Sequence, residues 1–267
     1  MIIKNTKSDQ SYKIYFNMNL KKYLNDLTKK YYKVALITDE NVYKIYKEKI
    51  NVRGLDILKI KPGEKSKSFT VKNSLDEKLL EKKFNRNSLI IGFGGGVVGD
   101  LSGYVAATIL RGIDLVHIPT SLIAIVDSSI GGKTGINSKN GKNLIGSFYN
   151  PREILINSEL IHTLPSKEIR QGLSEIIKYG VIKSEEIFNI LEKSNKFFMK
   201  NEKNNIDKII KKCIKIKIDI VEKDFKENDL RSILNFGHTI CHAIEKNYSY
   251  RFSHGDCIGT GMAIESL

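Results

Sequence analysis

Hydrophobic positions in the first part of the chain follow two alternating spacings. Short runs of β-branched and aliphatic residues predict buried parallel strands at 34–38, 56–60, 88–93, 114–119 and 153–157. Between these runs, residues such as 41–50 and 74–84 have the spacing of amphipathic helices. Strands that alternate with helices predict a parallel sheet covered by helices on both faces.

The pattern changes after residue 157. Residues 166–182, 205–225 and 231–247 have helical spacing, and Pro165 precedes the first of these stretches. The sequence therefore predicts an α/β protein with two domains. A Rossmann-like parallel-sheet domain covers 1–157, an all-helical domain covers 158–267, and we expect a cleft between them.

Composition places the chain among globular proteins. It has 267 residues, of which 41% are hydrophobic and 28% charged. No apolar run has the length of a membrane span, and the first ten residues lack the apolar core of a signal peptide. We expect a cytoplasmic protein that does not associate with membranes.

The formal charge of +14 raises the question of nucleic-acid binding. Only seven of the 44 basic residues are arginine, and the lysines are scattered along the chain without a basic block interleaved with aromatic residues. Lysines spread over solvated faces account for such a charge. We therefore expect no nucleic-acid partner and a small anionic ligand instead.

The three cysteines do not form a disulfide pattern. Cys213, Cys241 and Cys257 are odd in number and contain no C-x-x-C pair. Cys241 and Cys257 lie near histidines in the sequence, so metal ligation is one interpretation. Small buried thiols are the simpler one, and it is the one we expect.

A glycine-rich turn follows the predicted strand at 88–93. Gly94, Gly96 and Gly99 satisfy the spacing G-x-G-x-x-G, and Asp114 lies 20 residues after Gly94. The turn follows the third predicted strand, whereas the usual dinucleotide fingerprint follows the first. Two interpretations remain, namely a dinucleotide bound in a non-standard manner and a turn needed only for packing.

Residues 126–143 are rich in Asp, Gly, Lys and Asn. The segment GGKT (131–134) resembles the end of a P-loop, but position 127, where the first glycine of that motif would stand, is Asp127. The segment is therefore not a P-loop. Lys133, Lys142 and Asn143 are nevertheless suitable hydrogen-bond donors to an anionic oxygen.

Four polar residues are spaced along the predicted helix at 231–247. Arg231, Asn235, His238 and His242 follow one another at intervals of 4, 3 and 4, which places them on one helical face. This combination suits an active-site wall. A solvated outer face, the alternative, normally carries Lys and Glu.

A second polar line lies on the predicted helix at 166–182. Gln171, Glu175 and Lys178 are spaced at i, i+4 and i+7, and Glu175 is flanked by Leu173, Ile176 and Ile177. The Glu175 carboxylate therefore points into a site or pairs with Lys178.

Two histidines and one carboxylate form a suitable set of ligands for a catalytic zinc ion. The spacing leaves open whether His242 or His254 is the second histidine beside His238. The other histidines, His117 and His162, are expected to be structural.

Several segments in one order resemble the 3-dehydroquinate synthase family, over nearly the whole chain. They are GGGVVGDLSGYVAAT, VHIPTSLIAIVDSSIGGKTGIN, GKNLIGSF, GLSEIIKYG and LNFGHTICHAIE. That family belongs to the sugar phosphate cyclases and uses NAD and zinc in the shikimate pathway. Its sister cyclases and the glycerol-dehydrogenase-like enzymes share the fold and are the alternative interpretations.

The resemblance implies three sets of site residues. The metal, zinc or alternatively cobalt, would be held by Glu175, His238 and His254. NAD would contact Asp39, Asn41, Glu64, Lys67, Gly95, Gly96, Val97, Asp100, Thr120, Ser121, Lys142, Thr163 and Gln171. The substrate pocket would comprise Asp127, Lys133, Asn143, Lys178, Lys217, Glu227, Arg231, Asn235 and His242.

The resemblance also implies the reaction and the partners. The substrate is a phosphorylated sugar acid that is oxidised by NAD, loses phosphate, is reduced again and closes by an aldol step. Arg111 is similar to an arginine that reaches into a partner subunit, which implies a homodimer.

The last residues, GMAIESL, still have apolar helical spacing, and the final six contain no Gly, Asn or Pro that would signal the end of a helix. Members of the family continue with further helices, including a lysine that contacts phosphate. We therefore expect either an incomplete sequence or a weakly active, association-prone remnant.

Overall fold

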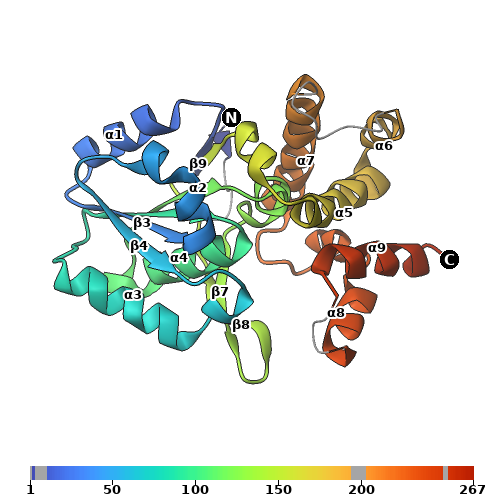
Figure 1. Cartoon of the computed structure of the whole chain (residues 1–267). Coiled ribbons are helices and arrows are strands. Elements are labelled where there is room, and N and C mark those ends of the chain that lie inside the picture. The colour runs from blue at the N-terminus through green and yellow to red at the C-terminus, as the bar shows by residue number, and fades with distance from the viewer. Residues whose placement is uncertain (1, 4–10, 194–202, 249–251) are drawn as a thin grey trace. The chain divides into compact units, whose positions relative to one another are not determined.

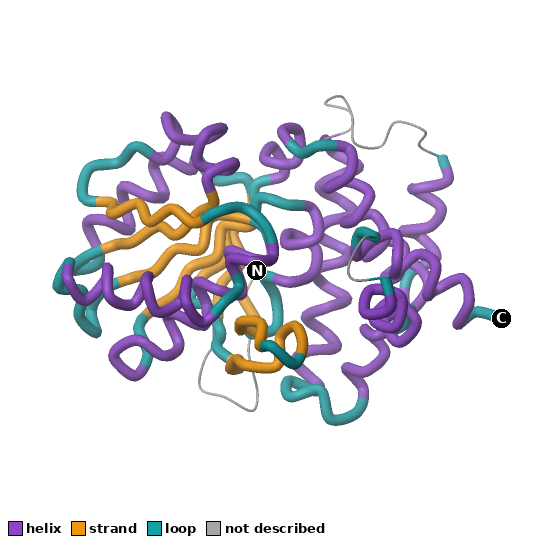
Figure 2. The backbone as a smooth tube through the Cα atoms, turned by 60° about the horizontal axis from the view of Figure 1, so that its bottom comes forward, coloured by secondary structure: helices purple, strands orange, loops and turns teal. Residues whose placement is uncertain are grey.

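The computed structural model describes residues 2–3, 11–193, 203–248 and 252–267. They fall into two units. Unit 1 contains the described residues up to Thr120 together with Gly132–Asn157, and unit 2 contains Ser121–Gly131 and the described residues from Ser158 onward. Strands are confined to unit 1 among the described residues, while unit 2 is helical (Figure 2).

Unit 1 is built on a sheet in the order β1-β2-β9-β6-β5-β3-β4, in which β1 is antiparallel and the other six strands are parallel. The strands of this sheet are β1 (Ile2–Ile3), β2 (Tyr12–Phe16), β3 (Val34–Asp39), β4 (Leu55–Ile60), β5 (Leu89–Gly94), β6 (Asp114–Pro119) and β9 (Glu153–Ile156). A separate antiparallel hairpin consists of β7 (Lys133–Ser138) and β8 (Gly141–Phe148). The predicted fold class and all five predicted strands are confirmed.

Helices cover the two faces of this sheet (Figure 1). They are α1 (Leu20–Lys30), α2 (Glu40–Ile50), α3 (Phe69–Glu81) and α4 (Gly96–Thr108). Side chains alternate along a strand, so Ala35 and Ile37 face one way and Leu36 the other. Ala35 and Ile37 belong to the apolar core that includes Leu79 of α3 and Leu101 of α4. Strands β3, β5 and β6 are buried on both faces, which explains their continuous apolar sequences.

Unit 2 contains α5 (Ser166–Lys183), α6 (Glu185–Glu192), α7 (Lys203–Lys223), α8 (His238–Asn247) and α9 (His254–Glu265). The helices predicted at 166–182 and 205–225 correspond to α5 and α7. A π-helix, η3 (Ala124–Ser128), also belongs to this unit and contacts both α5 and α7. No helix among the described residues is both long enough and apolar enough to cross a membrane.

The predicted single helix at 231–247 is wrong. Residues Leu230–Asn235 form a 3-10 helix, and α8 begins only at His238. Gly237 between them has a φ of +80°, a left-handed conformation that interrupts the α-helix. Arg231 and Asn235 therefore do not continue the α-helical face of His238 and His242.

Candidate active site

In unit 1, many of the residues predicted to contact NAD lie at the carboxyl ends of the parallel strands. Asp39 ends β3, Gly95 follows β5, and Thr120 follows β6. The Thr120 amide donates a hydrogen bond to the Gly94 carbonyl over 2.9 Å, which ties two of these ends together. Ligands of open parallel sheets bind at this edge.

The glycine turn leads directly into α4. Gly95 is the N-cap residue and Gly96 the first helical residue, so unpaired main-chain N–H groups are available at this end. The turn also has a packing role, because a Cβ on Gly94 would lie 2.6 Å from the Val98 Cβ. Both interpretations from the sequence are therefore compatible with the geometry.

Asp39 has a local role in addition to its position. Its carboxylate accepts hydrogen bonds from the amides of Asn41 and Val42 over 2.9 and 3.0 Å, which caps α2. One predicted cofactor residue therefore positions the main chain of another.

Lys67 connects the predicted cofactor residues with the β7–β8 hairpin. Its buried ammonium lies 2.6 Å from an Asp100 carboxylate oxygen and also donates to the Asn143 side chain. Glu64 accepts a hydrogen bond from Asn137 over 2.8 Å. The structure thus brings Glu64, Lys67 and Asp100 together with Asn143, a residue predicted for the substrate pocket.

Asp127 in η3 is the centre of a charged cluster in unit 2. Lys217 donates to both its carbonyl and its carboxylate over 2.7 Å, and the Tyr179 hydroxyl donates to the same carboxylate oxygen over 2.6 Å. Burial alone would raise the pKa of Asp127, but Lys217, Lys178 and Tyr179 outweigh it and hold the pKa well below its ordinary value. Asp127 is therefore ionised at neutral pH.

Arg231 is almost completely buried, at 2% exposure. Its guanidinium donates to the carbonyl of Phe225 and, over 3.2 Å, to that of Gly131. Nearby, Asn235 donates to the Glu227 carboxylate over 3.0 Å. The predicted substrate residues Arg231, Asn235 and Glu227 therefore organise the segment between α7 and α8.

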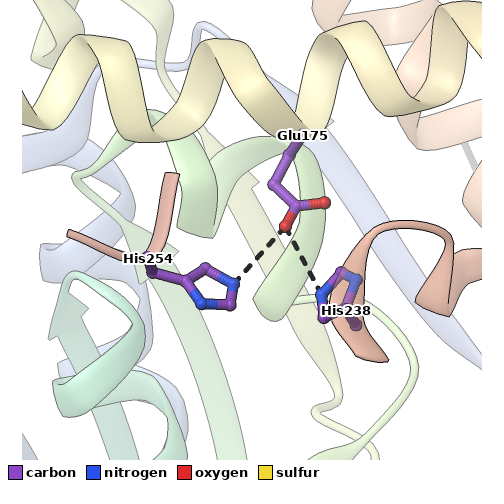
Figure 3. A group of neighbouring side chains, drawn as sticks. All are labelled: Glu175, His238 and His254. Atoms are coloured by element: carbon purple, nitrogen blue, oxygen red, sulfur yellow. Dashed lines mark ion pairs between the residues drawn. The ribbon is translucent and has the colours of Figure 1, made fainter. Parts of the chain in front are cut away.

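Glu175, His238 and His254 converge on one point, as Figure 3 shows. A single carboxylate oxygen of Glu175 lies 3.7 Å from His238 Nε2 and 3.6 Å from His254 Nε2. One donor atom from each residue lies within 4.8 Å of the other two. Of the two histidines that the sequence left open beside His238, the structure places His254 in this group. The His242 ring packs against the His238 ring instead, with centroids 5.6 Å apart.

The chemistry of this group fits a divalent metal such as zinc. Two imidazole nitrogens and one carboxylate oxygen are zinc ligands that leave a coordination position open. The second ring nitrogen of each histidine also faces an acceptor, since His238 Nδ1 lies 3.3 Å from the Phe236 carbonyl and His254 Nδ1 lies 3.5 Å from a Glu245 oxygen. Such partners orient histidines that bind metals.

The protonation states of this group are set by burial and by neighbouring charges. Burial lowers the pKa of His238 to about 4, so its ring is neutral. Burial also opposes a charge on His254, but hydrogen bonds with Cys241, Glu175 and Glu245 outweigh it and raise the pKa to about 12. A metal ion at this point must therefore displace a proton from His254.

Close contacts between glycines and neighbouring backbones bring the three helices together. A Cβ on Gly255 in α9 would lie 2.4 Å from the Gln171 Cα in α5. A Cβ on Gly261 would lie 2.1 Å from the Gly237 carbonyl oxygen, at the start of α8. The Ser174 hydroxyl in α5 also donates to the Gly255 carbonyl over 2.8 Å. These contacts allow Glu175 to reach His254.

The remaining predicted residues are dispersed. Arg111 is exposed in the turn after α4, and Lys133 is exposed at the start of β7. Ser121 and Gln171 belong to unit 2, as does Thr163, which donates to the Leu160 carbonyl over 3.0 Å. The expected cysteine state is confirmed, because all three thiols are buried and free.

Two polar residues beside the site are not predicted from the sequence. Tyr179 and Glu245 contact Asp127 and His254 through tertiary structure. Tyr179 lies between Lys178 and Gly180 in the sequence, and this position gives no sign of its buried hydroxyl.

Comparison with known proteins assigns the class. The structure is similar to 2-epi-5-epi-valiolone synthase from Streptomyces hygroscopicus subsp. jinggangensis 5008 with NAD+ and Zn2+ bound, at a TM-score of 0.87 and 24% identity, over 96% of this chain and 74% of that one. It is similar to 2-deoxy-scyllo-inosose synthase at a TM-score of 0.86 and 25% identity, over 98% of this chain and 74% of that one. The fold is therefore that of the sugar phosphate cyclases.

The sequence comparisons assign the family. Residues 57–171 match the model of the 3-dehydroquinate synthase N-terminal region, and residues 172–267 match that of its C-terminal region. The chain is 45% identical to 3-dehydroquinate synthase of Dictyoglomus thermophilum over 95% of its length and 72% of that protein. It is 51% identical to the Clostridium perfringens enzyme over 78% of its length and 59% of that protein. The chain belongs to the 3-dehydroquinate synthase family.

Proposed function

We propose that this chain catalyses the 3-dehydroquinate synthase reaction of the shikimate pathway. In this reaction 3-deoxy-D-arabino-heptulosonate 7-phosphate is converted to 3-dehydroquinate and phosphate. The observation that carries the proposal is the convergence of Glu175, His238 and His254 in a chain of this family. A related cyclase structure holds NAD+ and Zn2+, and another holds NAD+ and Co2+.

Glu175, His238 and His254 would hold the metal. When bound, a Zn2+ or Co2+ ion polarises a substrate hydroxyl oxygen and acidifies it. The neutral His238 ring offers a lone pair without first losing a proton. Lys178 pairs with Glu175 and remains a cation, because Glu175 and Asp127 raise its pKa against the effect of burial. The buried Glu175 carboxylate is thereby neutralised and held in place.

The NAD site would lie at the carboxyl edge of the sheet in unit 1. Bound NAD would supply a reversible hydride acceptor, so that no cofactor would be consumed. The main-chain N–H groups at the start of α4 would face its phosphates. Lys67 and Asp100 would keep their ion pair beside them.

The substrate's two anionic groups would be held by different residues. Lys133, Asn143, Asn235 and His242 are proposed for the phosphate, and Lys217 with Arg231 for the carboxylate. Lys217 is anchored by Asp127, and Arg231 by two main-chain carbonyls, so both cations have fixed positions. Fixed charges of this kind lose little entropy when a substrate binds.

A steady-state assay of phosphate release tests the activity. We expect release from the heptulosonate phosphate that requires both a divalent metal and NAD in small amounts, without accumulation of NADH. Net NADH formation would instead support a dehydrogenase of the same fold. Equal turnover of glucose 6-phosphate, which has no carboxylate, would contradict the roles of Lys217 and Arg231.

Metal analysis of three histidine variants tests the ligand assignment. We expect His238→Ala and His254→Ala to lose the metal, because each removes a ligand. His242→Ala should keep the metal and lose turnover. The reverse behaviour of the variants at 242 and 254 would refute the assignment.

We also propose a homodimer in which Arg111 contributes to the partner's site. Leu110 and Arg111 have φ values of +52° and +67°, a left-handed conformation that is strained for residues other than glycine. Strain of this kind concentrates at functional sites and supports a special role for this turn. Sedimentation of the purified chain tests the dimer, and a monomer with full activity would refute it.

A further inference from the structure

The two histidines of the proposed metal site are oriented in different ways. His238 Nδ1 faces the main-chain carbonyl of Phe236, at 3.3 Å. His254 Nδ1 faces two side chains of α8 instead, with the Glu245 carboxylate at 3.5 Å and the Cys241 sulfur at 3.7 Å. Of these two Nδ1 contacts, the one made by His254 is therefore the one that depends on side chains that a substitution can change.

Glu245 carries a carboxylate that is buried, which is unfavourable for a charged group. Its side chain is 8% exposed. Cys241 and Cys257, on the two helices α8 and α9, form an apolar cluster with Ile258 and Met262. Burial of a carboxylate costs free energy unless a donor compensates it, and the N–H of the His254 ring is such a donor.

We infer that Glu245 is a positioning residue, which accepts the His254 Nδ1 hydrogen and thereby aims Nε2 at the metal. The inference rests on the metal site proposed above. When a metal displaces one proton from this ring, Nδ1 keeps its hydrogen, and Nε2, which lies 3.6 Å from Glu175 Oε1, would be the nitrogen that binds the metal. A carboxylate acceptor also makes the imidazole a stronger ligand.

Cys241 is the competing acceptor for the same hydrogen. A thiol sulfur accepts hydrogen bonds weakly, whereas a carboxylate is a strong acceptor. Cys241, Glu245 and His254 also have donor atoms within 4.8 Å of one another, so they could bind a metal directly. The two arrangements predict different spectra, because a thiolate ligand to Co2+ adds a charge-transfer band.

The experiment titrates the metal-free chain with Co2+ against a competing chelator and records its visible spectrum. The variants are Glu245→Gln, Glu245→Asp and the matched control Cys241→Ala, which removes the other group facing the same nitrogen. Removal of the partner of a metal-bound histidine weakens binding about 10–100-fold. We expect a loss in this range for Glu245→Gln, with a changed spectrum.

Two further results are expected. Glu245→Asp keeps an anionic acceptor on a side chain shorter by one methylene group, so it should bind Co2+ more tightly than Glu245→Gln but less tightly than the original chain, while Cys241→Ala should keep the affinity and spectrum of the original chain. Unfolding of each metal-free variant in urea separates a loss of the fold from a loss of orientation. If Glu245→Gln does not fold, the comparison of Glu245→Asp with Cys241→Ala decides the question, and equal affinities would refute the inference.

Other outcomes would also refute it. A folded Glu245→Gln with unchanged affinity and spectrum would leave the metal site intact and remove the role of Glu245. A thiolate band that disappears in Cys241→Ala would place the metal on Cys241 instead. If the original chain does not bind Co2+ at all, the proposed metal site fails, and the inference fails with it.

Discussion

Replacement of Gly255 by alanine tests whether close contact between α5 and α9 builds the metal site. The new Cβ would lie 2.4 Å from the Gln171 Cα, a backbone atom, and 3.2 Å from the Gln171 carbonyl carbon. Carbon atoms pack favourably at about 3.5–4.0 Å, so α9 must move away from α5 by about 1 Å. Glu175 and His254 lie on these two helices and would separate.

Two effects determine how much Gly255→Ala changes the free energy of unfolding. Overpacking costs about 1–3 kcal/mol, and alanine regains about 1 kcal/mol over glycine within a helix. We therefore expect a loss of up to about 2 kcal/mol in the free energy of unfolding. The metal affinity should fall about 10–100-fold, because metal sites depend strongly on the groups that support them.

The assay combines urea unfolding of the metal-free chain with titration by Co2+ or Zn2+. Gly259→Ala is the matched control, because Gly259 is in the same helix and, apart from its chain neighbours and the backbone of its own helix, no described atom lies within 4 Å of an added Cβ. We expect this control to keep its metal affinity and to gain up to about 1 kcal/mol in stability. If Gly255→Ala matched the control in both measurements, the close contact would have no role in the metal site.

Two further predictions concern buried groups that can gain or lose a proton. Asp127→Asn removes the anion that pairs with Lys217, and breaking a buried pair costs about 3–5 kcal/mol. Urea unfolding should show a loss of free energy of unfolding at the lower end of this range, because the Asp127 side chain is 23% exposed. The difference in stability between the variant and the original chain should shrink below pH 4, since the depressed pKa of Asp127 stabilises the folded state only while the carboxylate is ionised. A stability equal to that of the original chain would refute this. Burial lowers the pKa of His117 from 6.5 to about 4, so the unfolded chain binds a proton between these pH values and the folded chain does not. Stability should fall by about 3 kcal/mol from this group as the pH drops through that window. His117→Gln should remove that part of the slope, and an unchanged slope in urea unfolding would refute the reasoning.

The sequence predicted those parts of the fold that depend on local pattern. Strands β3, β5 and β6 are buried on both faces, so their apolar runs are continuous and easily recognised. Strand β2 was missed because its buried and exposed residues are mixed with tyrosines and a lysine. The β7–β8 hairpin was missed because it is rich in glycine and polar residues and exposes Leu144 and Phe148.

In the candidate site, too, the features set by local spacing were predicted, and those that depend on tertiary contacts were not. Helical spacing correctly placed Glu175 and Lys178 on one side of α5, where they form an ion pair. The break at Gly237 was not foreseen, because apolar residues keep helical spacing on both sides of it. Spacing within one helix also could not choose between His242 and His254, since the choice depends on how closely α9 approaches α5. The contact of Glu245 with His254 depends on tertiary structure in the same way.

The pairing of β2 with β9 has a consequence for the order of events during synthesis. Lys13 lies opposite Glu153 and Phe16 opposite Ile156, so the two strands are separated by about 140 residues of chain. A ribosome that adds about 5–20 residues per second needs roughly 7–28 seconds to make that length. During this time, the edge of β2 that will pair with β9 has no partner strand, while β3, β4, β5 and β6 are completed. The segment Ser121–Gly131, which belongs to unit 2, is also made before unit 1 receives its last strand. Neither unit can therefore be finished before synthesis of the other has begun, and the first strands of the chain are the ones that most need protection from aggregation as they emerge.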